Sequence, residues 1–294
     1  MNPVTGKEFF QTPGELEFQG NMYPGVFPAK TLQRAEQFPF AKKDILIDTY
    51  PKSGTTWLQE IVYLITTKDF NTKETLNDRV PFMEMHWPGD IAEIDKLLGR
   101  KPPRIIKSHL PYQFLAHNLK DREQKIIIGM RNIKDVLVSF YHFYKMNRGL
   151  GPFHGSWDEF FEMFRHDKLT FGNYFDHVLG WWSQRHLANV HFVKFEDLKL
   201  DHSREIKKIA NFLDKPLTEA ELQKIVSATS FDCMKKNNLV NKAEVKVFRD
   251  NPGCFIRNGS VGGWKSHFTR EQNDYVDQLL QEKLSGTGLE FTYE

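Results

Sequence analysis

Short apolar runs alternate along the chain with longer segments in which apolar residues recur at helical spacing. The clearest run, 125–130 (KIIIGM), is apolar almost throughout, which is typical of a strand buried on both faces of a sheet. Similar runs predict three further strands, at Asp44–Tyr50, Ile105–Lys107 and Val190–Phe195. Helical spacing predicts helices at Thr56–Thr66, Asp135–Met146, Ser203–Leu213 and Arg270–Leu284. This alternation favours an α/β fold, with a central parallel sheet covered by helices on both faces.

Residues at the ends of two predicted helices are typical of helix boundaries. Ser203 is placed to cap the third helix, whereas Thr269 precedes the last helix and Gly286 follows it. Stretches with Pro and Gly at 22–28 and 148–155 are short enough to be loops inside one domain. No repeat or Ser/Gly-rich linker divides the sequence, so we expect residues 1–294 to form a single domain.

Composition narrows the class of protein. The chain has 294 residues with 25 Phe, 9 Tyr and 6 Trp, which excludes disordered, collagen-like and coiled-coil proteins. Lys and Arg number 40 against 38 Asp and Glu, so no strong overall charge draws the protein to nucleic acid or anionic lipid. A bound anion must therefore be held by a local arrangement of donors.

The sequence carries no evident targeting or membrane segment. Residues 1–20 hold charged residues throughout, unlike a signal peptide, and the apolar runs are far too short to span a bilayer. Cys233 and Cys254 cannot form a disulfide framework, and no CxxC pair indicates a metal or redox site. We expect a reduced, soluble, cytoplasmic protein that binds neither membranes nor nucleic acid and holds no metal.

A loop at 50–57 (YPKSGTTW) lies between a predicted strand and a predicted helix, in a P-loop-like arrangement. The first turn of a helix leaves backbone N–H groups unpaired, and the helix dipole favours an anion there. The loop adds a glycine, a lysine and three hydroxyls, at Gly54, Lys52, Ser53, Thr55 and Thr56. An ordinary strand–helix connection would not require these residues for packing, so the loop predicts a phosphate site.

A nucleoside-triphosphate-binding P-loop is the nearest alternative for this segment. Its motif requires a glycine, four residues, and then Gly-Lys followed by Ser or Thr. Here Lys52 precedes Gly54, and the Gly-Lys pair at 6–7 is followed by Glu8. The motif is therefore absent, which argues against a kinase or an ATPase.

Residues 49–57 (TYPKSGTTW) resemble the loop that binds the 5′-phosphosulfate in the cytosolic sulfotransferases, which use 3′-phosphoadenosine 5′-phosphosulfate (PAPS). The likeness continues through RIIKSHLP (104–111), RNIKDVLVSFY (131–141), FEDL (195–198), TSF (229–231) and FIRNGSVGGWK (255–265). The chain is thereby identified as a member of that family. The resemblance implies the sulfotransferase fold and transfer of a sulfuryl group from PAPS to a hydroxyl or amine of a small, aromatic or hydrophobic acceptor. It also implies PAP as the product and no metal.

The resemblance assigns catalytic roles to four residues. His109 is the expected general base, and an imidazole that titrates near neutral pH suits removal of the acceptor proton. Lys52 is expected to stabilise charge on the bridging oxygen, and Lys107 to act at the sulfuryl or phosphate oxygens. Ser139 is expected to serve both the reaction and the 3′-phosphate. Such a reaction depends mainly on positioning and on stabilising the leaving group.

The resemblance also predicts how the nucleotide is held. Arg131, Ser139, Arg257 and Gly259 are expected to bind the 3′-phosphate, since an Arg fork suits phosphate oxygens. Trp57 and Phe231 are expected to sandwich the adenine, with Thr229 at its edge. The remaining predicted cofactor residues belong to the two binding segments, and they are Ser53, Gly54, Thr55, Thr56, Phe255, Ile256 and Asn258.

Four apolar residues are expected in the acceptor pocket, because pockets for flat rings are mostly apolar. These residues are Phe27, Phe82, Met85 and Phe143. For Phe27 a plain core position is nearly as good an interpretation. The mouth of the pocket is expected in loops, at 22–27, 86–94, 146–154 and 240–254, and loops vary most between relatives.

Three positions depart from the family pattern. Asn258 stands where Lys is common, Gly263 where Asp is common, and Phe195 where Tyr is common. Loss of a positive charge at position 258 predicts weaker PAPS binding with the chemistry intact. The short dimer motif is partly kept, with Lys265 and Thr269 present but Arg270 and Asp274 changed, so a homodimer through Lys265–Asp274 stays open.

Other functions remain open beside sulfuryl transfer. A protein of the same fold could bind PAP or another small ligand with little or no turnover. A dehydratase that passes through a transient sulfate ester would carry the same motifs. The identity of the acceptor is not encoded in any of these motifs.

Overall fold

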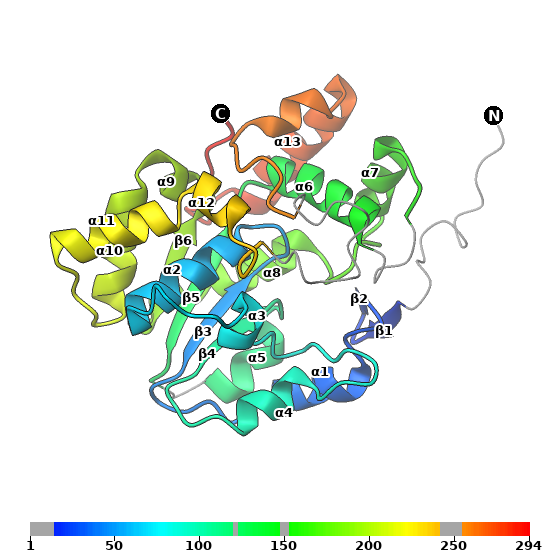
Figure 1. Cartoon of the computed structure of the whole chain (residues 1–294). Helices are drawn as coiled ribbons and strands as arrows, with labels where there is room; N and C mark the ends of the chain where they lie inside the picture. The colour runs from blue at the N-terminus through cyan, green and yellow to red at the C-terminus, as the bar shows by residue number, and fades with distance from the viewer. Residues whose placement is uncertain (1–14, 120–122, 148–152, 242–254) are drawn as a thin grey trace.

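The computed structural model describes residues 15–119, 123–147, 153–241 and 255–294. A four-stranded parallel sheet in the order β4-β3-β5-β6 forms its centre (Figure 1). Its strands are β3 (Ile45–Thr49), β4 (Ile105–Ser108), β5 (Lys125–Met130) and β6 (Val190–Lys194). All five residues of β3 and five of the six residues of β5 are buried, as expected for strands with both faces covered. The predicted α/β fold is confirmed.

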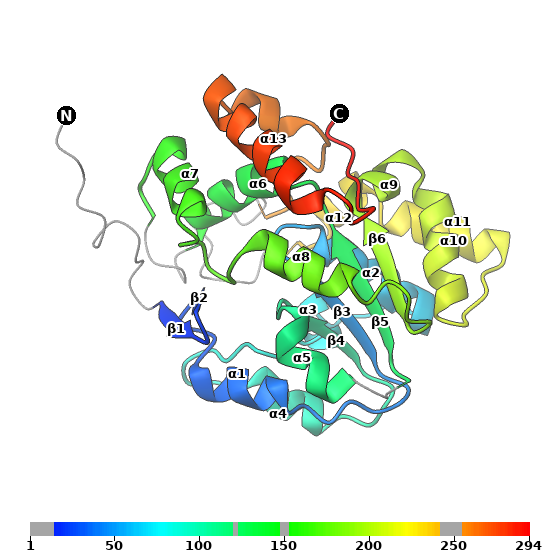
Figure 2. The ribbon, with the colours of Figure 1, turned by 180° about the vertical axis from the view of Figure 1, so that it is seen from behind.

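Helices cover both faces of this sheet, and alternate strand residues face opposite layers. Ile47 and Ile127 pack with α2 (Thr55–Thr67), α10 (His202–Phe212) and α11 (Glu219–Ala228). Leu46 and Ile126 belong to a second core cluster with α5 (Tyr112–Leu119), α6 (Ile133–Met146) and α8 (Tyr174–Trp182). Figure 2, seen from behind, shows α5 and α8 over that second face.

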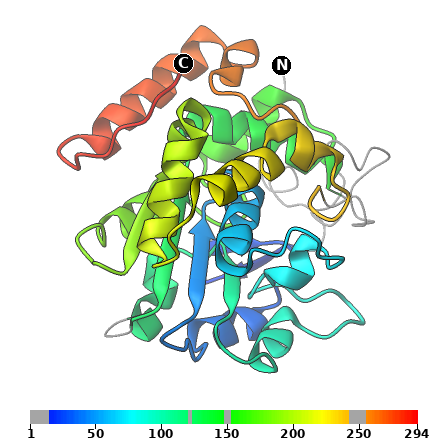
Figure 3. The same ribbon diagram turned by 60° about the vertical axis from the view of Figure 1, so that its left-hand side comes forward.

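Shorter elements complete the described part of the fold. A hairpin of β1 (Leu16–Phe18) and β2 (Asn21–Tyr23) lies at one side. The other elements are α1 (Ala29–Glu36), α3 (Leu76–Arg79), α4 (Glu93–Leu98), α7 (Trp157–Arg165), α9 (Phe195–Leu200), α12 (Phe231–Lys236), the 3₁₀ helix η3 (Gly263–Ser266) and α13 (Arg270–Leu284). Figure 3 shows α13 lying away from the sheet, beyond the helices that cover it.

The predicted strands and the last helix match closely, whereas the other three predicted helices begin one or two residues earlier than expected. The predicted range of α13 is confirmed, and Thr269 caps it in a reciprocal pair with Gln272. Ser203 is not the cap of α10, because Asp201 accepts the Arg204 N–H at 3.0 Å and the helix begins at His202. Helix α6 begins at Ile133, two residues before the prediction, with Asn132 as its cap.

Two predicted loops contain regular structure. Strand β2 takes up the beginning of the stretch at 22–28, and α4 begins inside the stretch at 86–94. These elements are too short to give a periodic pattern in the sequence. The stretches at 146–154 and 240–254 lie partly outside the described residues, and Cys254 lies outside them altogether.

A glycine in β5 brings helix α2 close to the sheet. A Cβ atom at Gly129 would lie 2.5 Å from Leu58 of α2 and 2.7 Å from Thr49 of β3, closer than real side chains approach. Helix α2 therefore rests directly on the backbone of β5. This contact fixes the loop between β3 and α2 at the carboxyl edge of the sheet, where open α/β sheets bind ligands.

Two kinds of feature, a membrane-spanning helix and a metal-binding cluster, are absent from the residues that the structure describes. None of the helices there has both the length and the apolar character that a membrane crossing requires. In the same part of the chain, no three His, Cys, Asp or Glu side chains gather in a way that could hold a metal ion.

Candidate active site

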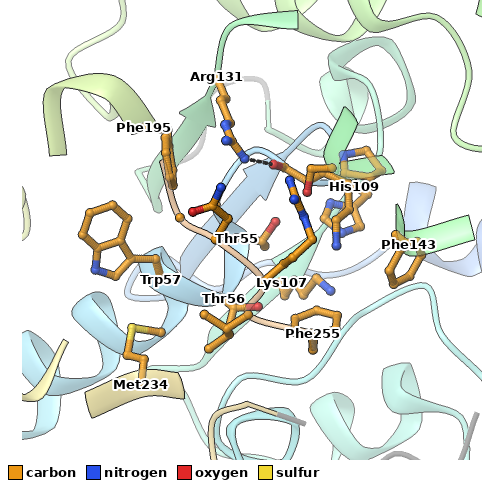
Figure 4. Close-up of a pocket in the computed structure, with 18 of the residues that line it drawn as sticks. Thr55, Thr56, Trp57, Lys107, His109, Arg131, Phe143, Phe195, Met234 and Phe255 are labelled. Atoms are coloured by element: carbon orange, nitrogen blue, oxygen red, sulfur yellow. Dashed lines mark hydrogen bonds between the residues drawn. The ribbon is translucent and has the colours of Figure 1, made fainter. Parts of the chain in front are cut away.

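A cavity of about 430 Å³ opens at the carboxyl edge of the sheet. Lys52, His109 and Arg131 enter it just after the ends of β3, β4 and β5. Because these strands are parallel and adjacent, their ends bring together residues that are far apart in the sequence. Figure 4 shows His109 and Arg131, together with Lys107, around one space.

The predicted site residues surround this cavity, with one exception. Those that line it are Phe27, Lys52, Gly54, Thr55, Thr56, Trp57, Phe82, Met85, Lys107, His109, Arg131, Ser139, Phe143, Thr229, Phe231, Phe255, Ile256, Arg257, Asn258 and Gly259. Ser53 is buried within the loop and does not line the cavity. Its buried hydroxyl has no hydrogen-bond partner among the residues that the structure describes.

The loop between β3 and α2 has the backbone of an anion-binding turn. Lys52 and Gly54 have positive φ angles of 71° and 93°. Gly54 precedes the first turn of α2, where the N–H groups point out of the helix toward the cavity. A Cβ at position 54 would lie 2.9 Å from the ring of Phe195, so that ring and the loop fit only because the residue is glycine.

His109 has a defined tautomer. Its Nδ1 lies 2.7 Å from the carbonyl oxygen of Thr49, which can only accept a hydrogen bond. Nδ1 therefore carries the proton, and the lone pair is on Nε2. The ring is buried between two phenyl rings, with centroids 4.8 Å from Phe82 and 5.4 Å from Phe171. With Nδ1 as the donor, Nε2 is the ring nitrogen that can act as an acceptor.

A buried carboxyl, that of Glu84, holds both the side chain of Ser108 and the backbone of His109. Glu84 Oε1 accepts the Ser108 hydroxyl and, at 3.1 Å, the backbone N–H of His109. Burial raises the pKa of Glu84 to about 7. No feature of the sequence distinguished Glu84 from other carboxylates, because its partners are 24 and 25 residues away.

Aromatic rings hold both lysines at the cavity. Lys107 Nζ lies 3.5 Å from the centroid of the Phe82 ring. Lys52 Nζ lies 4.2 Å from the Phe143 centroid and 4.7 Å from that of Phe255. The ring faces attract the ammonium groups. They also place these cations beside the apolar part of the cavity.

Arg131 joins the loop after β3 to the segment 255–260. Its Nη2 donates to the carbonyl of Ser260 at 2.9 Å, and its Nη1 to the carbonyl of Lys52 at 3.3 Å. The guanidinium stacks on Phe195 at 4.2 Å, and burial lowers its pKa. Its buried Nε has no partner among the described residues. An unsatisfied donor on a buried cation is suited to an anion such as a phosphate.

The segment that includes Gly259 is held from beneath by a single carboxylate. Asp135 accepts the backbone N–H groups of Gly262 at 2.9 Å and of Trp264 at 3.0 Å. Trp264 Nε1 in turn donates to the carbonyl of Tyr293 at 3.0 Å. Next to Asp135, Asn132 Nδ2 donates to the carbonyl of Thr292 at 3.1 Å. Residues 292–293 therefore support this segment.

Gly259 packs closely against the ring of Phe231. Its φ of 62° is in the left-handed region, and a Cβ there would lie 2.6 Å from the Phe231 ring. On the opposite side, Trp57 Nε1 donates to the carbonyl of Thr229 at 2.8 Å. Trp57 also meets the Phe195 ring edge to face at 5.5 Å. Trp57, Thr229 and Phe231 therefore share one end of the cavity.

Aromatic rings line the other end of the cavity. Phe27 lies 5.0 Å from Phe82 and 5.1 Å from Phe171, between ring centroids. Phe27 is thus a wall of the cavity as well as a core residue. Phe171 has a φ of 71°, and its N–H donates to the Met22 carbonyl at 2.7 Å. The β2 strand therefore helps to hold Phe171 in an unusual backbone conformation.

Sequence reasoning missed several residues that line the cavity. Pro24, Val26, Trp87 and Asn147 lie in the stretches predicted for the mouth of the pocket, and the residues that were not predicted are Asn77, Asp135, Phe171, Leu198, Lys199, His202, Ser230, Met234 and Ser260. Leu198 lies in a quoted motif, but nothing distinguished it from a core leucine. His202 is the first residue of α10, one residue before the predicted start of that helix.

Comparisons with known proteins agree with this geometry. A family model described as "Sulfotransferase domain" matches residues 42–288. Sulfotransferase 1C2 of Rattus norvegicus is 41% identical and covers 88% of this chain and 89% of its own length. Sulfotransferase 1B1 of Mus musculus is also 41% identical, with 92% of each chain covered.

Two solved structures are similar in fold. Mouse sulfotransferase SULT7A1, complexed with PAP, has a TM-score of 0.80 and 31% identity, and covers 94% of this chain and 96% of its own. Retinol dehydratase, in complex with androsterone and inactive cofactor PAP, has a TM-score of 0.84 and 25% identity, with 95% and 91% covered. The family match, the identity to named sulfotransferases and the shared fold together show that this chain belongs to the sulfotransferase family.

Proposed function

We propose that this protein transfers the sulfuryl group of PAPS to the hydroxyl of a small, flat, uncharged acceptor. The observation that carries the proposal is the hydrogen bond that the His109 imidazole donates from Nδ1 to the Thr49 carbonyl. Its Nε2 is thereby left as a base between an anion-binding loop and an aromatic wall.

The residues of the cavity fit the donor substrate. The loop from Lys52 to Thr56 suits the 5′-phosphosulfate, because a helix N-terminus, a lysine and hydroxyls converge there. Arg131, with a buried and unsatisfied Nε, suits the 3′-phosphate together with Ser139, Arg257 and the backbone of Gly259. Trp57 and Phe231 suit the adenine of the nucleotide, since aromatic rings can stack on it. The structural relative SULT7A1 was solved as a PAP complex, which supports this assignment.

The proposed reaction uses three side chains. His109 Nε2 takes the proton of the acceptor hydroxyl as its oxygen forms a bond to sulfur. The bond between sulfur and the bridging oxygen breaks, and its electron pair stays on the 5′-phosphate of PAP. Lys52 stabilises the charge that gathers on that oxygen, and Lys107 stabilises the sulfuryl oxygens.

Charge around the cavity favours a hydroxyl over a protonated amine. Lys52, Lys107, Arg131 and other cations line it, whereas Asp135 is the one acidic residue among the described lining residues. The Asp135 carboxylate is occupied by two backbone N–H groups. An ammonium acceptor would therefore meet repulsion without a counter-ion. The solved retinol dehydratase complexes contain androsterone or retinol, which are apolar alcohols and fit the same class.

Several finer assignments belong to the same proposal. We expect a single-domain enzyme that acts in the cytosol without a metal and without nucleic acid as a partner. A homodimer through Lys265–Asp274 also remains a proposal. In the described residues Lys265 pairs with Glu294 at 2.9 Å and Arg270 approaches Asp274 at 3.9 Å, so both motif cations have partners within the chain. Sedimentation at several concentrations would test the dimer.

Transfer of ³⁵S from labelled PAPS tests the proposal. The acceptors would be phenols, steroids, other alcohols and amines, in the presence of EDTA. Labelled sulfate ester on a hydroxyl acceptor, absent with His109→Ala, is the expected result. Nucleotide binding without any labelled product would favour the alternative of a binding protein. Loss of water from an allylic alcohol, with sulfate released, would favour a dehydratase.

A further inference from the structure

His202 lies at the end of the cavity that holds Trp57. It is the first residue of α10, and it lines the cavity although no motif of the sequence includes it. Its ring centroid lies 5.0 Å from that of Trp57, with the rings tilted by 54°. Its Nε2 lies 3.1 Å from the hydroxyl oxygen of Thr229. His202 therefore contacts two residues that we proposed to bind the adenine.

The Thr229 hydroxyl determines the tautomer of His202. That hydroxyl donates its proton to the carbonyl of Ile225 at 2.7 Å, since a carbonyl can only accept. The oxygen must then accept from His202, so Nε2 carries the ring proton and Nδ1 carries a lone pair. Burial, together with the charge of Lys199, lowers the pKa of His202 to about 4. The ring is therefore neutral at pH 7 and keeps this tautomer.

Other polar groups at this end are already engaged. Trp57 donates its Nε1 proton to the carbonyl of Thr229, and the Thr229 hydroxyl is shared between Ile225 and His202. Phe195, beside Trp57, has no hydroxyl with which to contact a base. Among the described residues, His202 Nδ1 takes no part in a hydrogen bond, and it is not a buried unsatisfied atom. It is an accessible acceptor.

We propose that His202 Nδ1 accepts a hydrogen bond from the exocyclic amino group of the adenine and thereby selects adenine over 6-oxopurines. A hypoxanthine or guanine base would present its O6 there, and two acceptors would face each other. This inference rests on the proposed function, which places the base between Trp57 and Phe231. His202 would supply a contact that the rings of Trp57 and Phe231 cannot, because stacking on a ring face does not distinguish one purine from another.

Calorimetric titration with two nucleotides tests this role. Adenosine 3′,5′-bisphosphate and inosine 3′,5′-bisphosphate have the same phosphates and differ at purine position 6. The wild-type protein should bind the adenosine compound about tenfold more tightly, the size of one hydrogen bond. His202→Phe keeps a ring beside Trp57 but loses both nitrogens. It should bind the adenosine compound about tenfold more weakly and the inosine compound within about twofold of wild type.

Two further variants make the result specific. His202→Gln offers an amide oxygen as an acceptor and should retain part of the preference. His117→Phe, an exposed histidine on α5, is the matched control and should retain all of it.

Three results would overturn the inference. Equal weakening of both nucleotides in His202→Phe would show that the ring only supports Trp57. Equal binding of both nucleotides by the wild type would show that position 6 is not recognised. Binding of neither nucleotide by the wild type would instead overturn the proposed function, on which this role depends.

Discussion

The Nδ1 atom of His109 lies 2.7 Å from the carbonyl oxygen of Thr49, across the junction of β3 and β4. Thr49 is the last residue of β3 and begins the loop that carries Lys52. The proposed general base and the loop proposed to hold the leaving group are thus anchored to the same strand end. Their relative position does not depend on a flexible connection.

Replacing His109 by alanine should lower kcat by about 10² to 10⁴, the range that a general base contributes. Affinity for PAP should stay within about twofold, because the imidazole faces the acceptor. Initial rates with saturating PAPS and calorimetry with PAP would measure the two effects. His117→Ala, an exposed position, is the control. Near-normal kcat in His109→Ala would show that another group takes the proton.

Glu84→Gln should remove part of the pH dependence of stability. Burial raises the pKa of Glu84 from 4.5 to about 7, so the native state keeps a proton that the unfolded chain has already released. Wild-type stability contributed by this group is full below pH 4.5 and falls as pH rises to about 7, by at most ~1.4 kcal/mol per pH unit. Glutamine keeps the acceptor oxygen for Ser108 and His109.

Urea unfolding at pH 5 and pH 8 would measure this effect. The difference in unfolding free energy between Glu84→Gln and wild type should shift in favour of the variant at pH 8. Glu271→Gln, an exposed position on α13, should show no such change. Parallel pH profiles for Glu84→Gln and wild type would contradict the raised pKa.

Asn258→Lys should strengthen PAP binding by about three- to tenfold at low salt. Asn258 is exposed at the rim of the cavity, next to Arg257, where a second cation would attract the 3′-phosphate. The gain should shrink at high salt, because exposed charges are screened. Calorimetry at two salt concentrations would measure it, with the exposed Asn71→Lys as the control. An unchanged affinity at low salt would place the 3′-phosphate elsewhere.

Gly259→Ala should weaken PAP binding by tenfold or more. The added Cβ would lie 2.6 Å from Phe231 and would displace either the ring or the backbone N–H. Gly286→Ala is the matched control, since φ is 72° there and nothing lies within 4 Å of its Cβ position. Both variants carry the cost of a side chain at positive φ, about 1–2 kcal/mol. Equal PAP affinity in the two variants would show that Gly259 does not contribute to nucleotide binding.

Local patterns predicted the elements that are long or strongly apolar. Strand β5 and helix α13 match their predicted ranges, since one is a continuous apolar run and the other has clear boundary residues. The cap of α10 was assigned to Ser203, although Asp201, two residues earlier, competes for the same role and occupies it. Short elements such as α4 depend on tertiary packing, and their sequences carry no periodic signal.

The site residues likewise divide into those that local sequence patterns predicted and those that depend on tertiary packing. Lys52 and His109 follow strand ends and Lys107 lies within β4, all three in recognisable motifs, and the structure places them around one cavity. Phe171 and His202 reach that cavity through packing between segments that are distant in sequence. A single sequence cannot show that Phe171 pairs with Met22, because the contact depends on how the whole chain folds.

The support that Thr292 and Tyr293 give to Asn132 and Trp264 has a consequence for how the protein is made. The chain emerges from the ribosome N-terminus first, so the sheet and the loop between β3 and α2 can form early. The segment from Arg257 to Gly259 lacks its support until residues 292–293 have emerged. A nascent chain is therefore poorly suited to retain the nucleotide, which can stabilise the fold only after synthesis has passed these residues.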